Sequence, residues 1–167
     1  MKETMNVPME ELKKATIDAL DNRGVSLKDL GELVYFLQGS YFNELTIEEC
    51  IYSVEKVLSK REVCHAVLTG ISLDIACEKQ ELKEPLLTIV QNDDKLFGVD
   101  ETLPLSILNI YGSISLTNFG YLDRVKAGII GELDSSEDRV NTFLDDLVAA
   151  LAAAASARLA HTFIRHE

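Results

Sequence analysis

The chain has 167 residues, a length that suits one domain with an ordinary core and leaves no room for a second large one. Sixteen basic and 28 acidic residues give a formal charge of −12, which argues against nucleic-acid binding because phosphate contacts need clustered Lys and Arg. Hydrophobic residues make up 47% of the chain, too many for a disordered acidic segment. The composition therefore predicts one compact domain over residues 1–167.

Cysteine and histidine are sparse and form no metal-binding pattern. They are Cys50, Cys64, Cys77, His65, His161 and His166. Three cysteines without a CxxC pair predict buried free thiols in a reducing compartment, and the histidines lack zinc-ligand spacing. The N-terminal sequence MKETMNVPMEEL has no apolar core of a signal peptide. We therefore expect a cytoplasmic protein without a zinc site.

Helical patterns begin near the N-terminus. Pro8 is expected to open a first helix that extends to about Leu20. Ser26 and Asp29 form a capping box before a second helix with apolar residues at helical spacing, which ends at Gly39. The first quarter of the chain is thus predicted to fold as two helices.

Three further helices are predicted over residues 46–91. Thr46 and Glu49 form a second capping box, and Ser59 with Glu62 is expected to restart the helix that continues through Ala76. Pro85 begins a short helical segment, LLTIVQ, after which the polar stretch NDDK interrupts the pattern.

Residues 102–122 form a run of 21 residues without a formal charge. The length could span a bilayer, but ten of these residues are polar, small or helix-breaking. We therefore predict a buried helix whose second half is strained or loop-like, and no transmembrane span.

The C-terminal segment carries the clearest helical pattern. Ser136, followed by two acids, is expected to cap a helix that runs towards Arg165. Beyond Asp145 and Asp146 this segment has no charge until Arg158, and a helix that is apolar on all sides is a buried helix. No segment shows strand alternation. The predicted fold class is all-α, a single-domain multi-helix bundle with an Ala-rich buried C-terminal helix.

Asp145 and Asp146 stand about one turn before this buried segment. Two neighbouring carboxylates in such a place do not stay ionised without compensation, which a divalent cation or basic partners would supply. Oxygen ligands alone suit Mg²⁺ or Mn²⁺. The alternative is a solvated acid cluster at a helix N-terminus, and the sequence leaves both readings open.

Two other acidic positions border the uncharged run. Asp100 and Glu101 precede it, and Asp123 ends it in the segment GYLDRVKAG. The pair also fits the ordinary preference for acids in the first turn of a helix. A helical bundle can bring such carboxylates together around metal, so we expect all five acids to line one cavity.

Three segments in this order, VDETLP, GYLDRVKAGIIGELD and FLDDLVAA, resemble phosphatidylglycerophosphatase A. They look more closely like its soluble relatives in Gram-positive bacteria, the low-temperature-requirement C proteins. The matching positions are Asp100 and Glu101 for the family's DE pair, Asp123 with Lys126 for its middle motif, Asp134 for its second Asp, and Asp145 with Asp146 for its DD pair. Ala127 stands where the family's membrane enzymes have Pro.

The resemblance implies Mg²⁺-dependent hydrolysis of a phosphate monoester, with Mn²⁺ as the alternative metal and phosphatidylglycerol phosphate as the family substrate. The implied metal ligands are Asp100, Glu101, Asp123, Asp145 and Asp146. The implied catalytic residues are Asp100, Glu101, Asp123, Lys126 and Asp146. Lys126, with Arg124 or Arg139, would face the phosphate, and one aspartate would act as base or nucleophile.

Two classes of function stay open at the level of sequence. The first is a phosphatase that acts on a phosphorylated lipid, met by peripheral contact at the inner face of the membrane, or on a small soluble phosphate monoester. The second is a non-catalytic helical protein that keeps a structural acidic site and assembles as a homo-oligomer through its Ala-rich helix. Convergence of the carboxylates would favour the first class.

Overall fold

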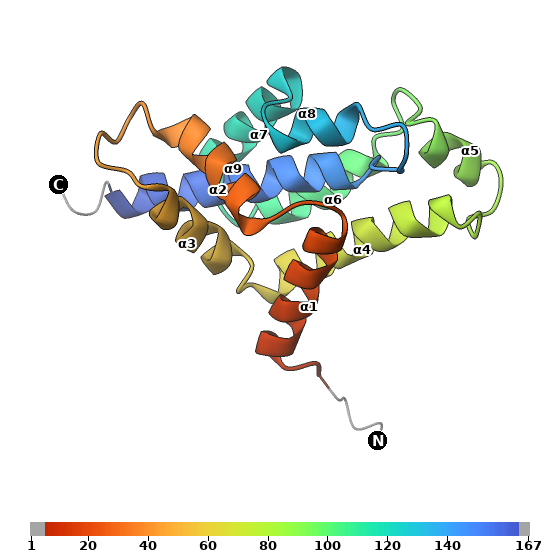
Figure 1. Cartoon of the computed structure of the whole chain (residues 1–167), viewed down its shortest axis with the longest axis horizontal. Helices are drawn as coiled ribbons and strands as arrows, with labels where there is room; N and C mark the ends of the chain where they lie inside the picture. Colours follow the sequence, from red (N-terminus) through yellow and green to blue (C-terminus); the bar gives the residue numbers. More distant parts are fainter. Residues whose placement is uncertain (1–5, 164–167) are drawn as a thin grey trace.

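The computed structural model describes residues 6–163, which form nine α-helices and no strand (Figure 1). The all-α prediction is therefore confirmed. The helices are α1 (Met9–Asn22), α2 (Leu27–Gln38), α3 (Ile47–Val57), α4 (Arg61–Glu78), α5 (Leu86–Gln91), α6 (Val99–Leu108), α7 (Ser113–Val125), α8 (Ile129–Asp134) and α9 (Leu144–Phe163).

Helix α9 is the centre of the fold. It runs through the middle of the molecule, and α2, α3, α4, α6, α7 and α8 all pack against it (Figure 1). Every residue from 141 to 157 is buried, including the six alanines among residues 149–155. The prediction of a buried Ala-rich helix is confirmed, and its alanines pack inside this chain, where small side chains let neighbouring helices approach closely.

A glycine sets how closely α4 approaches α9. A Cβ atom at Gly70 would collide with the side chain of Leu147 and crowd the Cβ of Phe143. The missing side chain therefore lets the two helices come together near the beginning of α9. One turn further along α4, Asp74 reaches the α9 backbone from this close position.

Of the capping predictions, those at Ser26 and Thr46 are confirmed, and the one at Ser59 is wrong. The hydroxyls of Ser26 and Thr46 accept hydrogen bonds from the backbone N–H groups of Asp29 and Glu49, whose carboxylates accept in return. Ser59 caps nothing, because its hydroxyl donates to a carbonyl of the preceding helix, and α4 begins at Arg61 without a side-chain cap.

The uncharged run was wrongly predicted as one helix. It forms most of two helices, α6 and α7, and the second of these is regular rather than loop-like. The chain turns at Gly112, whose φ of 81° lies in the left-handed region that favours glycine. Each helix buries one side against the core and exposes the other, so the run is only partly buried.

The predicted start of the last helix was also wrong. Ser136 and the two acids that follow it are exposed and lie outside any helix, and α9 begins at Leu144. The sequence pattern gave no sign of the short helix α8. Arg165, the predicted end of α9, lies outside the described residues.

The prediction of buried free thiols agrees with the structure. Cys50, Cys64 and Cys77 are buried and free, while the neighbouring His65 and the distant His161 are exposed. His166 lies outside the described residues. Within residues 6–163, no helix is both long enough and apolar enough to cross a bilayer.

Candidate active site

Lys126 joins three carboxylates that are far apart in the sequence. Its Nζ lies 3.1 Å from Asp123 Oδ1, 3.0 Å from Asp145 Oδ2 and 3.3 Å from Asp134 Oδ1. Partial burial works to lower the pKa of Lys126, but Asp145 and Asp123 outweigh it and hold the pKa above its usual range. The lysine is therefore a cation at any ordinary pH and neutralises part of the cluster.

Three helix ends bring these groups together. Asp123 lies in the last turn of α7, Asp134 ends α8, and Asp145 lies in the first turn of α9. Lys126 follows α7 in the left-handed conformation, with φ 47° and ψ 49°, which turns the chain towards α8. The lysine thus stands at the corner between α7 and α8, over the beginning of α9.

Asp146 is the most buried uncompensated acid of the cluster. Asp146 is only 6% exposed, and its carboxylate makes no hydrogen bond or ion pair with the described residues. Burial, together with the charges of Asp145 and Asp123, raises the pKa of Asp146 to about 8. Burial raises the pKa of Asp145 to about 6, against the lowering effect of Lys126.

Asp100 points into the same region from the first turn of α6. Its Oδ1 atom is buried and has no hydrogen-bond partner, and its charge contributes to the raised pKa of Asp146. Glu101, its neighbour, is exposed. It lines an acidic pocket of about 360 Å³ together with Asp93, Asp94 and Asp100. Of the predicted pair, Asp100 therefore lies closer to the buried aspartates.

The cluster contains an acid that the sequence reading missed. Asp93 raises the pKa of Asp145, and its own pKa is raised by partial burial and by Asp100. Its φ of 48° places it in the left-handed region, two residues after the end of α5. The NDDK interruption was the only available signal, and it was read as a break between helices.

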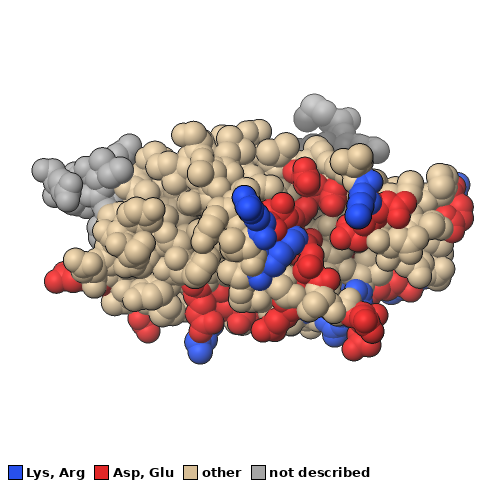
Figure 2. Space-filling model, turned by 90° about the horizontal axis from the view of Figure 1, so that it is seen from above, with Lys and Arg blue, Asp and Glu red and all other residues tan. Residues whose placement is uncertain are grey.

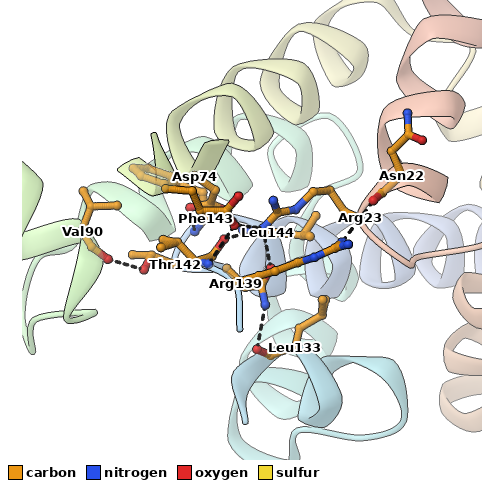
Figure 3. A network of polar contacts seen from close by, with 12 residues as sticks. Asn22, Arg23, Asp74, Val90, Leu133, Arg139, Thr142, Phe143 and Leu144 are labelled. Carbon is orange, nitrogen blue, oxygen red and sulfur yellow. Dashed lines mark hydrogen bonds and ion pairs between the residues drawn. The ribbon is translucent and has the colours of Figure 1, made fainter. Parts of the chain in front are cut away.

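A polar pocket of about 120 Å³ adjoins the cluster. Its lining includes three acids, Asp93, Asp134 and Asp145, together with Arg139 and Asn141. Arg139 is exposed and donates a hydrogen bond to the backbone carbonyl of Asn22 (Figure 3). This pocket is where a small anionic group could lie against both an arginine and the acid cluster. Arg124, the other candidate for phosphate contact, is exposed at the end of α7.

The surface around the cluster has mixed charge. Seen from the side of α7 and α8, acidic side chains gather with a few basic ones over one half of the molecule, and the other half carries few charged groups (Figure 2). A strongly acidic chain repels anions at long range. Binding of a phosphate group therefore requires local positive charge.

The ligand atoms of the cluster are of the kind that binds a divalent cation, but the side chains are not arranged around a metal position. In the stretch from 6 to 163, no three His, Cys, Asp or Glu side chains stand in an arrangement that would hold a metal ion. The donors, however, are all carboxylate oxygens, and Asp100 Oδ1 is buried without a partner. Such a set suits Mg²⁺ or Mn²⁺, and the Lys126 ammonium already occupies a cation position among three of the acids.

Fold and site together define an all-helical protein whose polar centre is a lysine-linked group of aspartates at the start of a buried central helix. The chain belongs to the phosphatidylglycerophosphatase A family, whose profile matches residues 26–161. The resemblance found in the sequence is thereby confirmed.

Similar proteins occur in Bacillus subtilis and Listeria monocytogenes. The chain is 55% identical to uncharacterized protein YpjQ of Bacillus subtilis over 154 residues, which cover 92% of this chain and 87% of that protein. The crystal structure of YpjQ superposes with a TM-score of 0.93 at 53% identity, covering 96% of this chain and all of the other. The low temperature requirement C protein of Listeria monocytogenes gives 0.91 at 50% identity, covering 94% and 99%.

Proposed function

We propose that this protein is a Mg²⁺-dependent phosphate monoester hydrolase, with Mn²⁺ as a substitute metal, and that it acts on a phosphorylated lipid such as phosphatidylglycerol phosphate. The observation that supports the proposal is the ion pairing of Lys126 with Asp123 and Asp145 beside the buried Asp146, whose pKa is raised by the charges of Asp145, Asp123 and Asp100. Membership of the phosphatidylglycerophosphatase A family supports the reaction class.

Asp100, Asp123, Asp145 and Asp146 are the proposed metal ligands, with Glu101 at the exposed edge. A bound divalent cation would neutralise phosphoryl oxygens and lower the pKa of an attacking water. Lys126 holds the carboxylates together and supplies positive charge for the phosphate. Without metal, burial and the neighbouring carboxylates raise the pKa of Asp146 to about 8, and a bound cation would lower it, so that Asp146 would bind the metal as a carboxylate.

The direct test of the proposal is phosphate release. Purified protein with Mg²⁺ is expected to release phosphate from phosphatidylglycerol phosphate in detergent micelles, and EDTA is expected to abolish the release. A small water-soluble monoester is assayed in parallel. Release from the soluble monoester alone would keep the phosphatase and reject the lipid substrate. No release from either with Mg²⁺, Mn²⁺ or Co²⁺ would reject the enzyme and leave the non-catalytic reading.

Binding of the metal is expected to raise the melting temperature. A cation that binds only the folded state adds about 2.7 kcal/mol at a concentration of 100 times its Kd, or roughly 5–10 °C for a chain of this size. Asp146→Asn should lose this increment, while Glu48→Gln, an exposed acid in the first turn of α3, should keep it. Differential scanning calorimetry with and without Mn²⁺ measures the difference. Equal shifts in both variants would place the cation elsewhere.

A further inference from the structure

We infer that Asp74, on α4, is a positioning residue for the proposed active site: it fixes the N-terminal turn of α9, and through that turn it fixes Asp145 and Asp146. The expected effect of Asp74 on kcat rests on the proposed function. Its expected effect on the first turn of α9 rests on geometry alone. Asp74 is fully buried and belongs to none of the acidic motifs of the sequence.

The carboxylate of Asp74 accepts two hydrogen bonds from the start of α9. The backbone N–H of Phe143 donates to Oδ1 at 3.1 Å, and that of Leu144 donates to Oδ2 at 3.0 Å (Figure 3). These are N–H groups that have no partner within the helix, so a buried α9 requires an acceptor from elsewhere. Asp74 supplies that acceptor across 69 and 70 residues of sequence.

The two bonds end immediately before the site. Leu144 is followed by Asp145 and Asp146, and the N–H of Asp146 donates to Asp145 Oδ1 at 2.8 Å. A rotation or shift of the first turn would therefore move both site carboxylates together, and with them the 3.0 Å contact of Asp145 to Lys126.

The segment before α9 is fastened by a second group of contacts. Arg23 Nη2 donates to the carbonyl of Val140 at 2.6 Å and to Asn141 Oδ1 at 3.0 Å, and it forms an ion pair with Glu78 at 2.8 Å. Glu78 also accepts from the N–H of Val140 at 2.9 Å. Asp74 and Glu78 lie one turn apart on α4, and together with Arg23, which follows α1, they hold the approach to α9. The position of Asp74 is therefore set by rigid structure and not by a loop.

The test compares Asp74 with a second buried side chain that contacts the backbone of α9 further from the acids. Ser53 is buried on α3, and its hydroxyl donates to the carbonyl of Ala155 at 2.9 Å. Ser53→Ala thus removes a buried polar contact to α9 at Ala155, about two and a half turns beyond Asp146, and serves as the matched control for Asp74→Ala. Asp74→Asn keeps one acceptor oxygen and tests rescue.

The kinetic readout is the split between kcat and KM. A displacement of about 1 Å in reacting groups can cost on the order of 10²-fold in rate, so Asp74→Ala is expected to lose about that much in kcat with a smaller change in KM. Asp74→Asn should recover part of the loss, and Ser53→Ala should keep the wild-type kcat although its melting temperature falls. Losses of kcat that follow melting temperature equally in all three variants would overturn the inference.

The second readout needs no activity. Hydrogen exchange at the amides of residues 143–147 is expected to accelerate about tenfold or more in Asp74→Ala and not in Ser53→Ala, because the first turn opens locally. If the wild type hydrolyses neither substrate, the proposed function fails and exchange alone decides the positioning role. Unchanged exchange in Asp74→Ala, or in Asp74→Asn if the alanine variant does not fold, would overturn it.

Discussion

Replacing Asp146 with Asn is expected to lower kcat for phosphate release by about 10²–10³-fold, the loss typical when one group that stabilises transition-state charge is removed. The side chains have nearly the same shape, and Asp146 makes no hydrogen bond through its carboxylate with the described residues, so the substitution removes charge and basicity without breaking a contact. Initial rates at saturating Mg²⁺ and substrate measure the effect.

The matched control for this prediction is Asp94→Asn. Asp94 is exposed beside Asp93 and lines the acidic pocket of about 360 Å³, so its variant carries the same change of charge at the edge of the site. It is expected to stay within about threefold of wild type, the range of a surface charge contact. A large loss at Asp94 together with a small one at Asp146 would place the reaction in that acidic pocket and contradict the proposed ligand set.

Stability in the absence of divalent metal is expected to fall as the pH rises from about 4 to 8. The pKa of Asp146 is raised from 3.8 to about 8, so the folded state binds a proton that the unfolded state has released. The stabilisation is complete below the unfolded pKa and is lost as the pH passes the folded one. Asp145 and Asp74, with pKa values of about 6 and 7, act in the same direction.

The measurement is urea unfolding in EDTA at several pH values. One such group changes the free energy of unfolding by at most about 1.4 kcal/mol per pH unit. Asp146→Asn should remove its share of this slope and be more stable than wild type at pH 8. Parallel pH profiles for the two proteins would contradict the buried, uncompensated state of Asp146.

Those features of the fold that depend on neighbouring residues could be predicted from the sequence. The capping boxes at Ser26 and Thr46 each join residues three apart, and both form. The burial of α9 follows from a long segment without charges, since such a helix has no side to expose to water. Asp123, Asp145 and Asp146 were found because each borders an uncharged segment.

Features that depend on contacts distant in sequence could not be predicted. Ser136 looks like a helix cap, but the N–H groups of α9 are satisfied by Asp74 from another helix, so the helix begins eight residues later. Asp93 reaches the site only because its segment folds back from α5, and no local pattern encodes that return. Gly112 divided a run that looked continuous, because a left-handed turn leaves no signature beyond one glycine.

Placing the site on α9 ties its geometry to the integrity of the whole molecule. Asp145 and Asp146 stand on the helix against which α2, α3, α4, α6, α7 and α8 pack, so these two acids keep their place as long as the core is intact. The positions of these two carboxylates on α9 are therefore fixed whenever the protein is folded. Adjustment to a substrate must therefore come from the parts that surround α9 at the surface, namely residues 92–98 before α6 and the corner between α7 and α8.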